Sequence, residues 1–347
     1  MKKTLALAAA ILSLSCSHKE ATLFVGTYSD GFLALEYPSG EVMAKASMPN
    51  PSFLAIKGNK VYAVSEMPDS TASVYAWRYG GNGFELLGCQ PTGIGGLQGE
   101  DPCHVVTNGK ILAVSNYSGG TLALYSLSTE GGIAPLDSLI LSSAGGPDLS
   151  RQETPHIHCA AFSPEGKHLF FSEFSADEIG SIDIVGGISN YRKAAQLPAG
   201  FGPRHLLFDA SGKHFYVIGE LSGDIAVFDY RDGMLNPIQT VKADAVNARG
   251  AADIHFSPDG RFLYVSLRLR NEGIAVFSVR EDGTLAPAGY QLTGPHPRNF
   301  AVTRDQVIVA CRDSDTIEIY ARDPRTGLLR DSGRRIPAPK PVFVALQ

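Results

Sequence analysis

A unit of about fifty residues recurs along the chain and constrains the fold more than any other feature. Each copy reads as Pro or a small residue, a polar residue, an apolar strand, a Gly-containing turn, a second strand with a polar end, and a third alternating strand. Six copies begin at Pro51, Pro102, Pro155, Pro203, Ala252 and Pro297. Their spacing of about 45 to 53 residues is the length of a four-stranded propeller blade.

The two ends of the chain supply the parts of one further blade. The segment 341–346 reads as a first strand with no second strand after it, whereas 23–28 and 31–37 read as second and third strands without a first. Joined, these segments close a ring and leave no free sheet edge at the seam. We therefore predict an all-β fold, a seven-bladed β-propeller formed as one domain over residues 21–347, with the N- and C-terminal strands sharing one blade. One or two β-sandwiches are the alternative.

The first residues form a separate targeting segment. Lys2 and Lys3 precede the apolar run 5–14, and small residues lead up to Cys16. This order predicts a secretory signal peptide over residues 1–15, and the run is short for a membrane span. Cys16 resembles the lipidated cysteine of bacterial lipoproteins, so we expect an exported lipoprotein of a bacterial cell envelope, in the periplasm or at the outer membrane. Plain secretion and an uncleaved anchor are the alternatives.

Charge and motif content exclude several classes of partner. The formal net charge of −5 provides no broad basic surface, so we expect no nucleic-acid partner, and we expect membrane contact only through the lipid anchor. The four remaining cysteines, expected to be free and buried, form no C-x-x-C pair, and no nucleotide-binding loop or zinc motif is present. No cofactor is expected.

Propeller geometry gathers polar residues at one mouth of the central channel. First strands run side by side along the channel, so equivalent positions form rings, and each second strand ends beside the start of its first strand. The ring after the Pro-like position is predicted as Ser52, Cys103, His156, Arg204, Asp253, Arg298 and Val342. Two positions further on lie Leu54, Val105, His158, Leu206, His255, Phe300 and Val344. The second strands are expected to end in Glu66, Asn116, Glu173, Glu220, Arg268, Arg312 and Thr27. These rings predict a concave polar pocket on a rigid scaffold.

Short motifs along nearly the whole chain resemble one family. The clearest are 203–206 (Pro-Arg-His-Leu) with 219–223 (Gly-Glu-Leu-Ser-Gly), supported by 26–28, 102–105, 115–120, 151–152, 156–158, 252–255 and 297–300. They are similar to the seven-bladed lactonase family, which contains propeller-type 6-phosphogluconolactonases and the carboxy-muconate lactonizing enzyme. The chain departs from the usual family residues at Ile157, Gly219 and Leu267, which leaves the substrate open.

The resemblance implies a catalytic set of Arg204, Glu220 and one of His156 and His158. Opening a lactone requires a base that activates water and a cation that holds the developing oxyanion. Glu220 or the histidine is expected to be the base, with Arg204 and Arg298 or Arg268 as electrostatic clamps. The expected substrate-binding residues are Arg298, Arg268, His104, Asn116, Glu173, Asp253 and His255. The expected partner is a small-molecule lactone or sugar acid.

Three other functions remain open from the sequence. The chain is alternatively a non-catalytic envelope protein that binds a ligand or partner at the channel mouth, or a muconate-type lactonizing cycloisomerase. A metal enzyme is the third alternative, because Glu66, Asn116, Glu173 and Glu220 offer oxygen ligands. The substrate of a 6-phosphogluconolactonase is cytosolic, whereas the signal peptide directs this chain out of the cytosol. Either the substrate is a different, extracellular lactone, or the segment 1–15 is not a signal.

Overall fold

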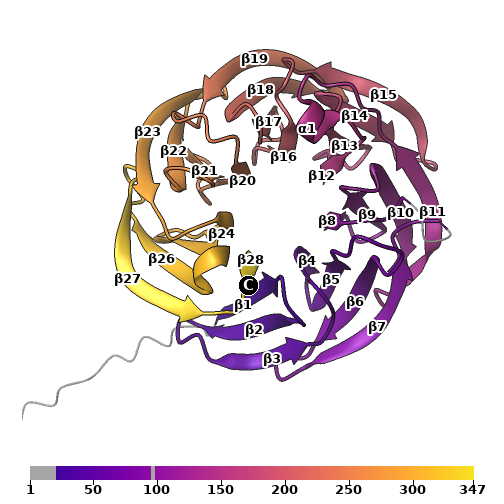
Figure 1. Cartoon of the computed structure of the whole chain (residues 1–347), viewed down its shortest axis with the longest axis horizontal. Coiled ribbons are helices and arrows are strands. Elements are labelled where there is room, and N and C mark those ends of the chain that lie inside the picture. Colours follow the sequence, from indigo (N-terminus) through magenta and orange to yellow (C-terminus); the bar gives the residue numbers. More distant parts are fainter. Residues whose placement is uncertain (1–20, 95–97) are drawn as a thin grey trace, which may run out of the picture.

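Seven four-stranded antiparallel sheets surround a central channel (Figure 1). The computed structural model describes residues 21–94 and 98–347. The predicted seven-bladed β-propeller is confirmed, including the blade that combines both ends of the chain, whose strand order is β28-β1-β2-β3. The predicted signal peptide and Cys16 lie outside the described residues.

Each blade runs from an innermost strand at the channel to an outermost strand at the rim (Figure 1). The innermost strands are β4 (Leu54–Lys57), β8 (Pro102–Thr107), β12 (Ile157–Phe162), β16 (Pro203–Phe208), β20 (Ala251–Phe256), β24 (Pro297–Val302) and β28 (Pro341–Leu346). The second strands are β1 (Ala21–Thr27), β5 (Lys60–Ser65), β9 (Ile111–Asn116), β13 (His168–Glu173), β17 (His214–Gly219), β21 (Phe262–Leu267) and β25 (Gln306–Cys311).

The outer half of each blade is more exposed. The third strands are β2 (Phe32–Tyr37), β6 (Ser73–Tyr79), β10 (Thr121–Leu127), β14 (Glu178–Asp183), β18 (Asp224–Arg231), β22 (Gly273–Val279) and β26 (Thr316–Arg322). The fourth strands are β3 (Val42–Ala46), β7 (Phe84–Pro91), β11 (Ile133–Leu141), β15 (Ser189–Gln196), β19 (Met234–Lys242), β23 (Leu285–Leu292) and β27 (Leu329–Pro337).

The core consists of apolar layers between neighbouring blades. Second strands are buried on both faces, as in β21, where every residue is buried, and such strands read as continuous apolar runs. Between the closing blade and its neighbour, for example, Leu23, Val25 and Val344 pack with Ile308 and Ile317. These layers hold the blades rigidly around the channel.

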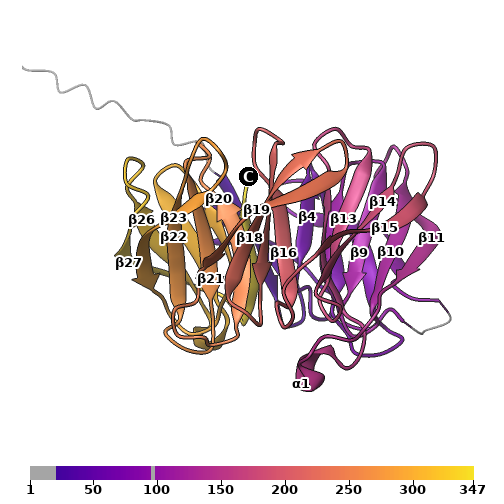
Figure 2. The ribbon, with the colours of Figure 1, turned by 90° about the horizontal axis from the view of Figure 1, so that it is seen from above.

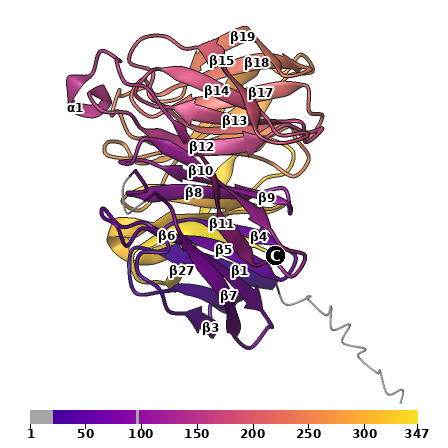
Figure 3. The ribbon, with the colours of Figure 1, turned by 90° about the vertical axis from the view of Figure 1, so that its right-hand side faces the viewer.

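One short helix interrupts the all-β pattern, which the sequence did not predict. Helix α1 (Leu149–Gln152) projects from the face at which the innermost strands begin, here called the mouth face (Figures 2 and 3). Asp148 caps its N-terminus by accepting a hydrogen bond from the backbone N–H of Ser150. The buried Gln152 donates to the Phe174 carbonyl at 3.0 Å and to Asp177 at 2.8 Å. These bonds fix the loop against the blade. A single 3₁₀ turn, η1 (Arg312–Ser314), follows β25.

Two further features bear on the sequence predictions. Cys103, Cys159 and Cys311 are free and buried, as expected, whereas Cys89 is free but exposed. Within residues 21–94 and 98–347, no helix is long and apolar enough to cross a membrane.

A β-bulge near the start of the innermost strand recurs in six of the seven blades. In β16, Pro203 pairs with Gly219 but Leu206 pairs with Val217, so the first strand holds one extra residue. A bulge breaks the alternation of side chains and re-aims them. The consecutive residues Arg204 and His205 consequently both face the channel, where His205 lies across from Phe53 with ring centroids 5.8 Å apart.

Candidate active site

A polar pocket of about 170 Å³ occupies the channel at the mouth face. It is small for a ligand site, since pockets for drug-sized molecules hold roughly 300–1,000 Å³, and it suits a single small ring. Its lining comes from several blades and from the α1 loop, namely Tyr28, Glu66, Cys103, Tyr117, Arg151, His158, Glu220, Arg268 and Arg298.

Two rings of equivalent positions supply nearly all of this lining. The strand-end ring consists of the residue directly after each second strand: Tyr28, Glu66, Tyr117, Phe174, Glu220, Arg268 and Arg312. The bulge ring consists of the residue that follows the first paired residue of each bulge: Cys103, His158, Arg204, Ala252, Arg298 and Val342. Ser52 is the equivalent residue of the blade without a bulge and is counted with them. The strand-end and bulge positions of every blade lie at the same level of the channel, so the repeated blades together form the pocket wall.

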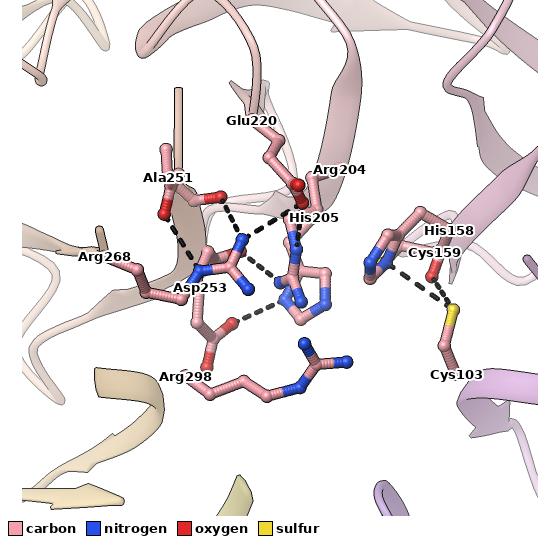
Figure 4. A network of polar contacts seen from close by, with 12 residues as sticks. Cys103, His158, Cys159, Arg204, His205, Glu220, Ala251, Asp253, Arg268 and Arg298 are labelled. Atoms are coloured by element: carbon pink, nitrogen blue, oxygen red, sulfur yellow. Dashed lines mark hydrogen bonds and ion pairs between the residues drawn. The ribbon is translucent and has the colours of Figure 1, made fainter. Parts of the chain in front are cut away.

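Glu220 is the centre of the positively charged side of the pocket (Figure 4). Its Oε2 lies 2.9 Å from Nε of Arg204 and 3.2 Å from Nη2 of Arg268, and its Oε1 accepts from Nη2 of Arg151 at 2.8 Å. Arg151 also donates to the Tyr117 hydroxyl at 3.1 Å. Three guanidinium groups thus occupy both carboxylate oxygens.

The electrostatics of this cluster keep Glu220 ionised. Burial raises the pKa of Glu220, but Arg268, Arg204 and Arg151 outweigh it and lower the pKa to about 2. Burial also lowers the pKa of Arg268, with Arg204 adding to the effect and Glu220 opposing it, to about 9. The cluster holds more positive than negative charge, so it attracts an anion.

Glu66 and Arg298 form the opposite side of the pocket. Oε1 of Glu66 accepts a hydrogen bond from the Tyr28 hydroxyl at 2.7 Å and lies 3.8 Å from Nη2 of Arg298. The Arg298 guanidinium stacks over the Tyr28 ring, 5.2 Å from its centroid. Burial opposes the charge on Arg298, but Tyr28 and Glu66 hold its pKa above the usual value. Arg298 therefore stays charged.

A neutral pair, Cys103 and His158, completes the pocket wall. Sγ of Cys103 lies 3.7 Å from Nδ1 of His158 and 3.4 Å from the His158 carbonyl. Burial and the charge of Arg204 hold the pKa of His158 well below its usual value. Burial and Glu66 hold the pKa of Cys103 well above its usual value. The imidazole and the thiol are thus both uncharged.

The next residue of each bulge closes the channel beneath the pocket. This plug ring consists of Phe53, His104, Cys159, His205, Asp253, Asn299 and Phe343. Asp253 accepts from Nδ1 of His205 at 2.6 Å and also from Asn299, while Phe53 packs on His104 and Phe343 with ring centroids 4.4 and 4.7 Å apart. Burial lowers the pKa of His205 to about 4. The pocket consequently has a packed floor.

Five of the residues predicted from the sequence meet at the pocket. Glu220, His158, Arg268 and Arg298 line it, and Arg204 lies directly behind Glu220. His156 does not line it: its ring stacks on the outer side of Tyr117 with centroids 4.1 Å apart, and its Nδ1 lies 2.7 Å from the Tyr117 carbonyl. Ile157, not Pro155, occupies the position equivalent to Pro203, which moves His158 into the bulge ring.

Two predicted strand-end residues turn away from the pocket. Asn116 and Glu173 are the last residues of β9 and β13, one position before the strand-end ring, so they face the blade interior. Asn116 donates to the Thr92 carbonyl at 2.9 Å, and Glu173 accepts from the Tyr191 hydroxyl at 2.6 Å. Both side chains are completely buried.

Three further predicted residues lie below the pocket. His104 and Asp253 belong to the plug ring, because Ala252 and not Asp253 is the residue equivalent to Arg204. His255 lies deeper still; its Nε2 is 2.8 Å from Asp253, and its side chain is 43% exposed. A larger hollow of about 430 Å³ lies between blade turns, lined by Pro258, Asp259 and Arg261 among others, and shares no residue with the pocket.

The sequence reading missed Tyr28, Tyr117 and Arg151. The two tyrosines occupy the same ring position as Glu220, and aligning the strand ends one residue later finds them. Arg151 lies in the only loop that carries a helix in the described chain, so no repeat signals it. Among the described residues, no group of three or more His, Cys, Asp or Glu side chains is arranged to hold a metal ion.

The fold and the pocket define a class of propeller whose channel is closed into a small, charged ligand site. A family model described as "Lactonase, 7-bladed beta-propeller" matches residues 22–346, and the chain belongs to this lactonase family. A 6-phosphogluconolactonase of Formosa agariphila is 33% identical over 337 residues, covering 89% of this chain and 94% of that protein.

Solved structures agree with this assignment. A crystal structure of a protein from Bacteroides uniformis has a TM-score of 0.90 and 44% identity, covering 94% of this chain and 99% of that one. The periplasmic gluconolactonase of Pseudomonas aeruginosa has a TM-score of 0.85 and 25% identity, covering 94% of this chain and 98% of that one. The resemblance found in the sequence motifs is confirmed.

Proposed function

We propose that the pocket hydrolyses a small sugar-acid lactone that carries a negative charge, as in 6-phosphogluconolactonase. The single observation that carries this proposal is Arg298. Its side chain is only 15% exposed and lines the pocket, yet it makes no hydrogen bond to any described residue. A guanidinium has five donors, and its planar fork matches a carboxylate, a phosphate or an oxyanion. A bound anion would satisfy those donors.

The chemistry follows from the two sides of the pocket. Water adds to the lactone carbonyl, and the negative charge that develops on the carbonyl oxygen requires preorganised donors. Arg298 and the Glu220 cluster provide them. Arg204, Arg268 and Glu220 form a rigid positive wall, and neutral His158 lies beside it. The carboxylate or phosphate of the sugar acid binds whichever of Arg298, Arg204 and Arg268 does not contact the oxyanion.

A lactone panel tests the proposal directly. Purified protein is assayed with gluconolactone, 6-phosphogluconolactone and a muconolactone, and we expect turnover of at least one sugar-acid lactone. Arg298→Ala is expected to lower kcat/KM by about 10²–10³-fold, the usual effect of removing an oxyanion donor. Arg304→Ala is the matched control, because that side chain is 85% exposed and lies outside the pocket. Unchanged turnover in Arg298→Ala, Arg204→Ala and Glu220→Gln rejects the assignment, and ligand-induced stabilisation without turnover favours a binding protein.

We also propose that the mature protein is held at the bacterial envelope through a lipid on Cys16. A periplasmic relative supports export. Strand β1 starts at Ala21 and ends at Thr27, which pairs with Pro341 at the mouth end, whereas Leu23 pairs with Leu346 near the C-terminus. The C-terminus lies at the face opposite α1 (Figure 2), so Ala21 lies at the face away from the pocket. Five residues reach at most about 18 Å, so a lipid on Cys16 would leave the pocket facing away from the membrane. Cys16→Ser is expected to move the protein to the soluble fraction; retention in the membrane fraction would contradict the anchor.

A further inference from the structure

Two glutamates line the pocket at the same ring position, yet their surroundings differ. Both oxygens of Glu220 contact arginines from three different segments of the chain. Glu66 accepts one strong hydrogen bond, from Tyr28, and its nearest guanidinium is 3.8 Å away. Its Oε2 is buried and has no hydrogen-bond partner among the described residues.

An unsatisfied buried carboxylate oxygen is costly unless something binds it. A buried acceptor without a partner costs about 1–3 kcal/mol, and more when it is charged. Oε2 itself is closed off from solvent, but the Glu66 side chain is 15% exposed and lines the pocket, so a water molecule or a substrate hydroxyl approaches the carboxylate from the cavity on the side of Oε1. The same pocket holds Arg298, which has only the 3.8 Å contact to Glu66 and no hydrogen-bond acceptor in the part of the chain that the structure describes. An unmatched acceptor and an unmatched donor set therefore lie on one side of a small cavity.

We propose that Glu66 is the general base of lactone hydrolysis, and that Glu220 is a positioning residue that holds the arginines. The proposal rests on the proposed lactonase function and assigns its catalytic group. Tyr28 orients the Glu66 carboxylate through Oε1.

The step balances without any further reactant. A water molecule on Glu66 gives its proton to the carboxylate while its oxygen forms a bond to the lactone carbonyl carbon, and the carbonyl π pair moves to the oxyanion. When the C=O bond re-forms, the ring C–O bond breaks, and the leaving alkoxide takes the proton from Glu66. One water is consumed, the hydroxy acid is released, and Glu66 is again ionised.

Glu220, His158 and Cys103 are each poorly suited to act as the base. The pKa of Glu220 is lowered to about 2, since three arginines outweigh the effect of burial, and a carboxylate that binds protons so weakly is a poor general base. Burial and Arg204 likewise hold the pKa of His158 far below its usual value. The Cys103 thiol is buried, and its raised pKa keeps it protonated. Glu66 is the remaining acceptor in the lining.

The test compares Glu66→Gln with Glu220→Gln in the full mature protein, on a lactone that the wild type hydrolyses. We expect Glu66→Gln to lower kcat by about 10²–10⁴-fold with little change in KM or melting temperature. Glu220→Gln is expected to lower the melting temperature and to raise KM. If Glu66→Gln retains kcat within about threefold, the inference is overturned while the lactonase function stands; if the wild type hydrolyses no lactone, both are overturned.

Two readouts separate catalysis by Glu66 from a structural role. Glu66→Asp, which keeps a carboxylate on a shorter side chain, is expected to retain more of kcat than Glu66→Gln, because a carboxylate accepts the proton and an amide does not. Formate at high concentration is expected to restore part of the activity of Glu66→Ala, and the matched Glu220→Ala is expected to gain nothing. If Glu66→Asp recovers no activity over Glu66→Gln and formate rescues nothing, the proposal is overturned.

Discussion

The Glu220 side and the Glu66 side of the pocket are built from the same kinds of side chain but reach opposite outcomes. Each contains a strand-end glutamate, a tyrosine and an arginine of the bulge ring. On one side three arginines contact the Glu220 carboxylate. On the other side Tyr28 alone hydrogen-bonds to the Glu66 carboxylate, and Arg298 makes no hydrogen bond within residues 21–94 and 98–347. The difference shows that ring position alone does not determine how a repeated glutamate is paired; the number of arginines that reach it does.

The largest effect is expected from removing the buried arginine of the Glu220 side. Arg204 is 2% exposed and pairs with Glu220, so Arg204→Met leaves part of a buried charge unpaired. We expect the free energy of unfolding to fall by about 3–5 kcal/mol and turnover to be lost. Denaturant unfolding measures this, with Arg304→Met as the exposed control, expected within about 0.5 kcal/mol of wild type. A decrease in the unfolding free energy of less than about 1 kcal/mol would show that the Arg204–Glu220 pair contributes little to the stability of the fold.

A pH series tests the same side through Glu220. Its pKa is lowered to about 2 in the fold from the usual 4.5 of a glutamate, so the fold favours the ionised form. The resulting stabilisation is fully present above about pH 4.5 and is lost as the pH falls toward 2; at 1.36 kcal/mol per pKa unit it is about 3 kcal/mol. We expect the unfolding free energy of wild type to fall more steeply across this window than that of Glu220→Gln. Parallel curves would refute the strong coupling of Glu220 to the arginines.

The smallest effect is expected from replacing the two histidines, and the comparison tests where the pocket ends. His158 lines the pocket, and His156 stacks outside it on Tyr117. We expect His158→Ala to lower kcat/KM by about tenfold, which corresponds to roughly 1.4 kcal/mol, and His156→Ala to change it less than about threefold. Steady-state kinetics on the same lactone gives both values. A reversed order would mean that the working site extends over Tyr117.

The fold was predictable because every blade repeats the same local signals. The complementary ends, 23–37 and 341–346, predicted the shared blade that β28 and β1 form. The lactonase family followed from motifs spread over the whole chain. Arg204, Glu220, Arg268 and Arg298 were also placed together correctly, because residues at equal positions of equal strands lie at one level of the channel.

The remaining errors arise from the bulge, from the place where the second strands end and from the α1 loop. Strand alternation assigns side chains to faces only while the pairing is regular, and the bulge adds a residue just where the pocket begins. Asp253 was therefore placed in the ring of Arg204, although Ala252 occupies that position. Asn116 and Glu173 were placed in the pocket, although each is the last residue of its strand and lies one position before the strand-end ring. Arg151 was missed because a unique loop provides no repeat for comparison.

Strand β28, near the carboxyl terminus, closes the ring by pairing with β1. Val25 pairs with Val344 from the opposite end of the chain, so the contact that completes the ring also closes the longest loop and carries a large loop-closure entropy cost. Phe343 on that last strand packs on Phe53 within the floor of the channel. A chain cut before Pro341 would expose an edge of β1 and open the floor at once, so loss of a few terminal residues would disable a site to which they contribute no lining side chain.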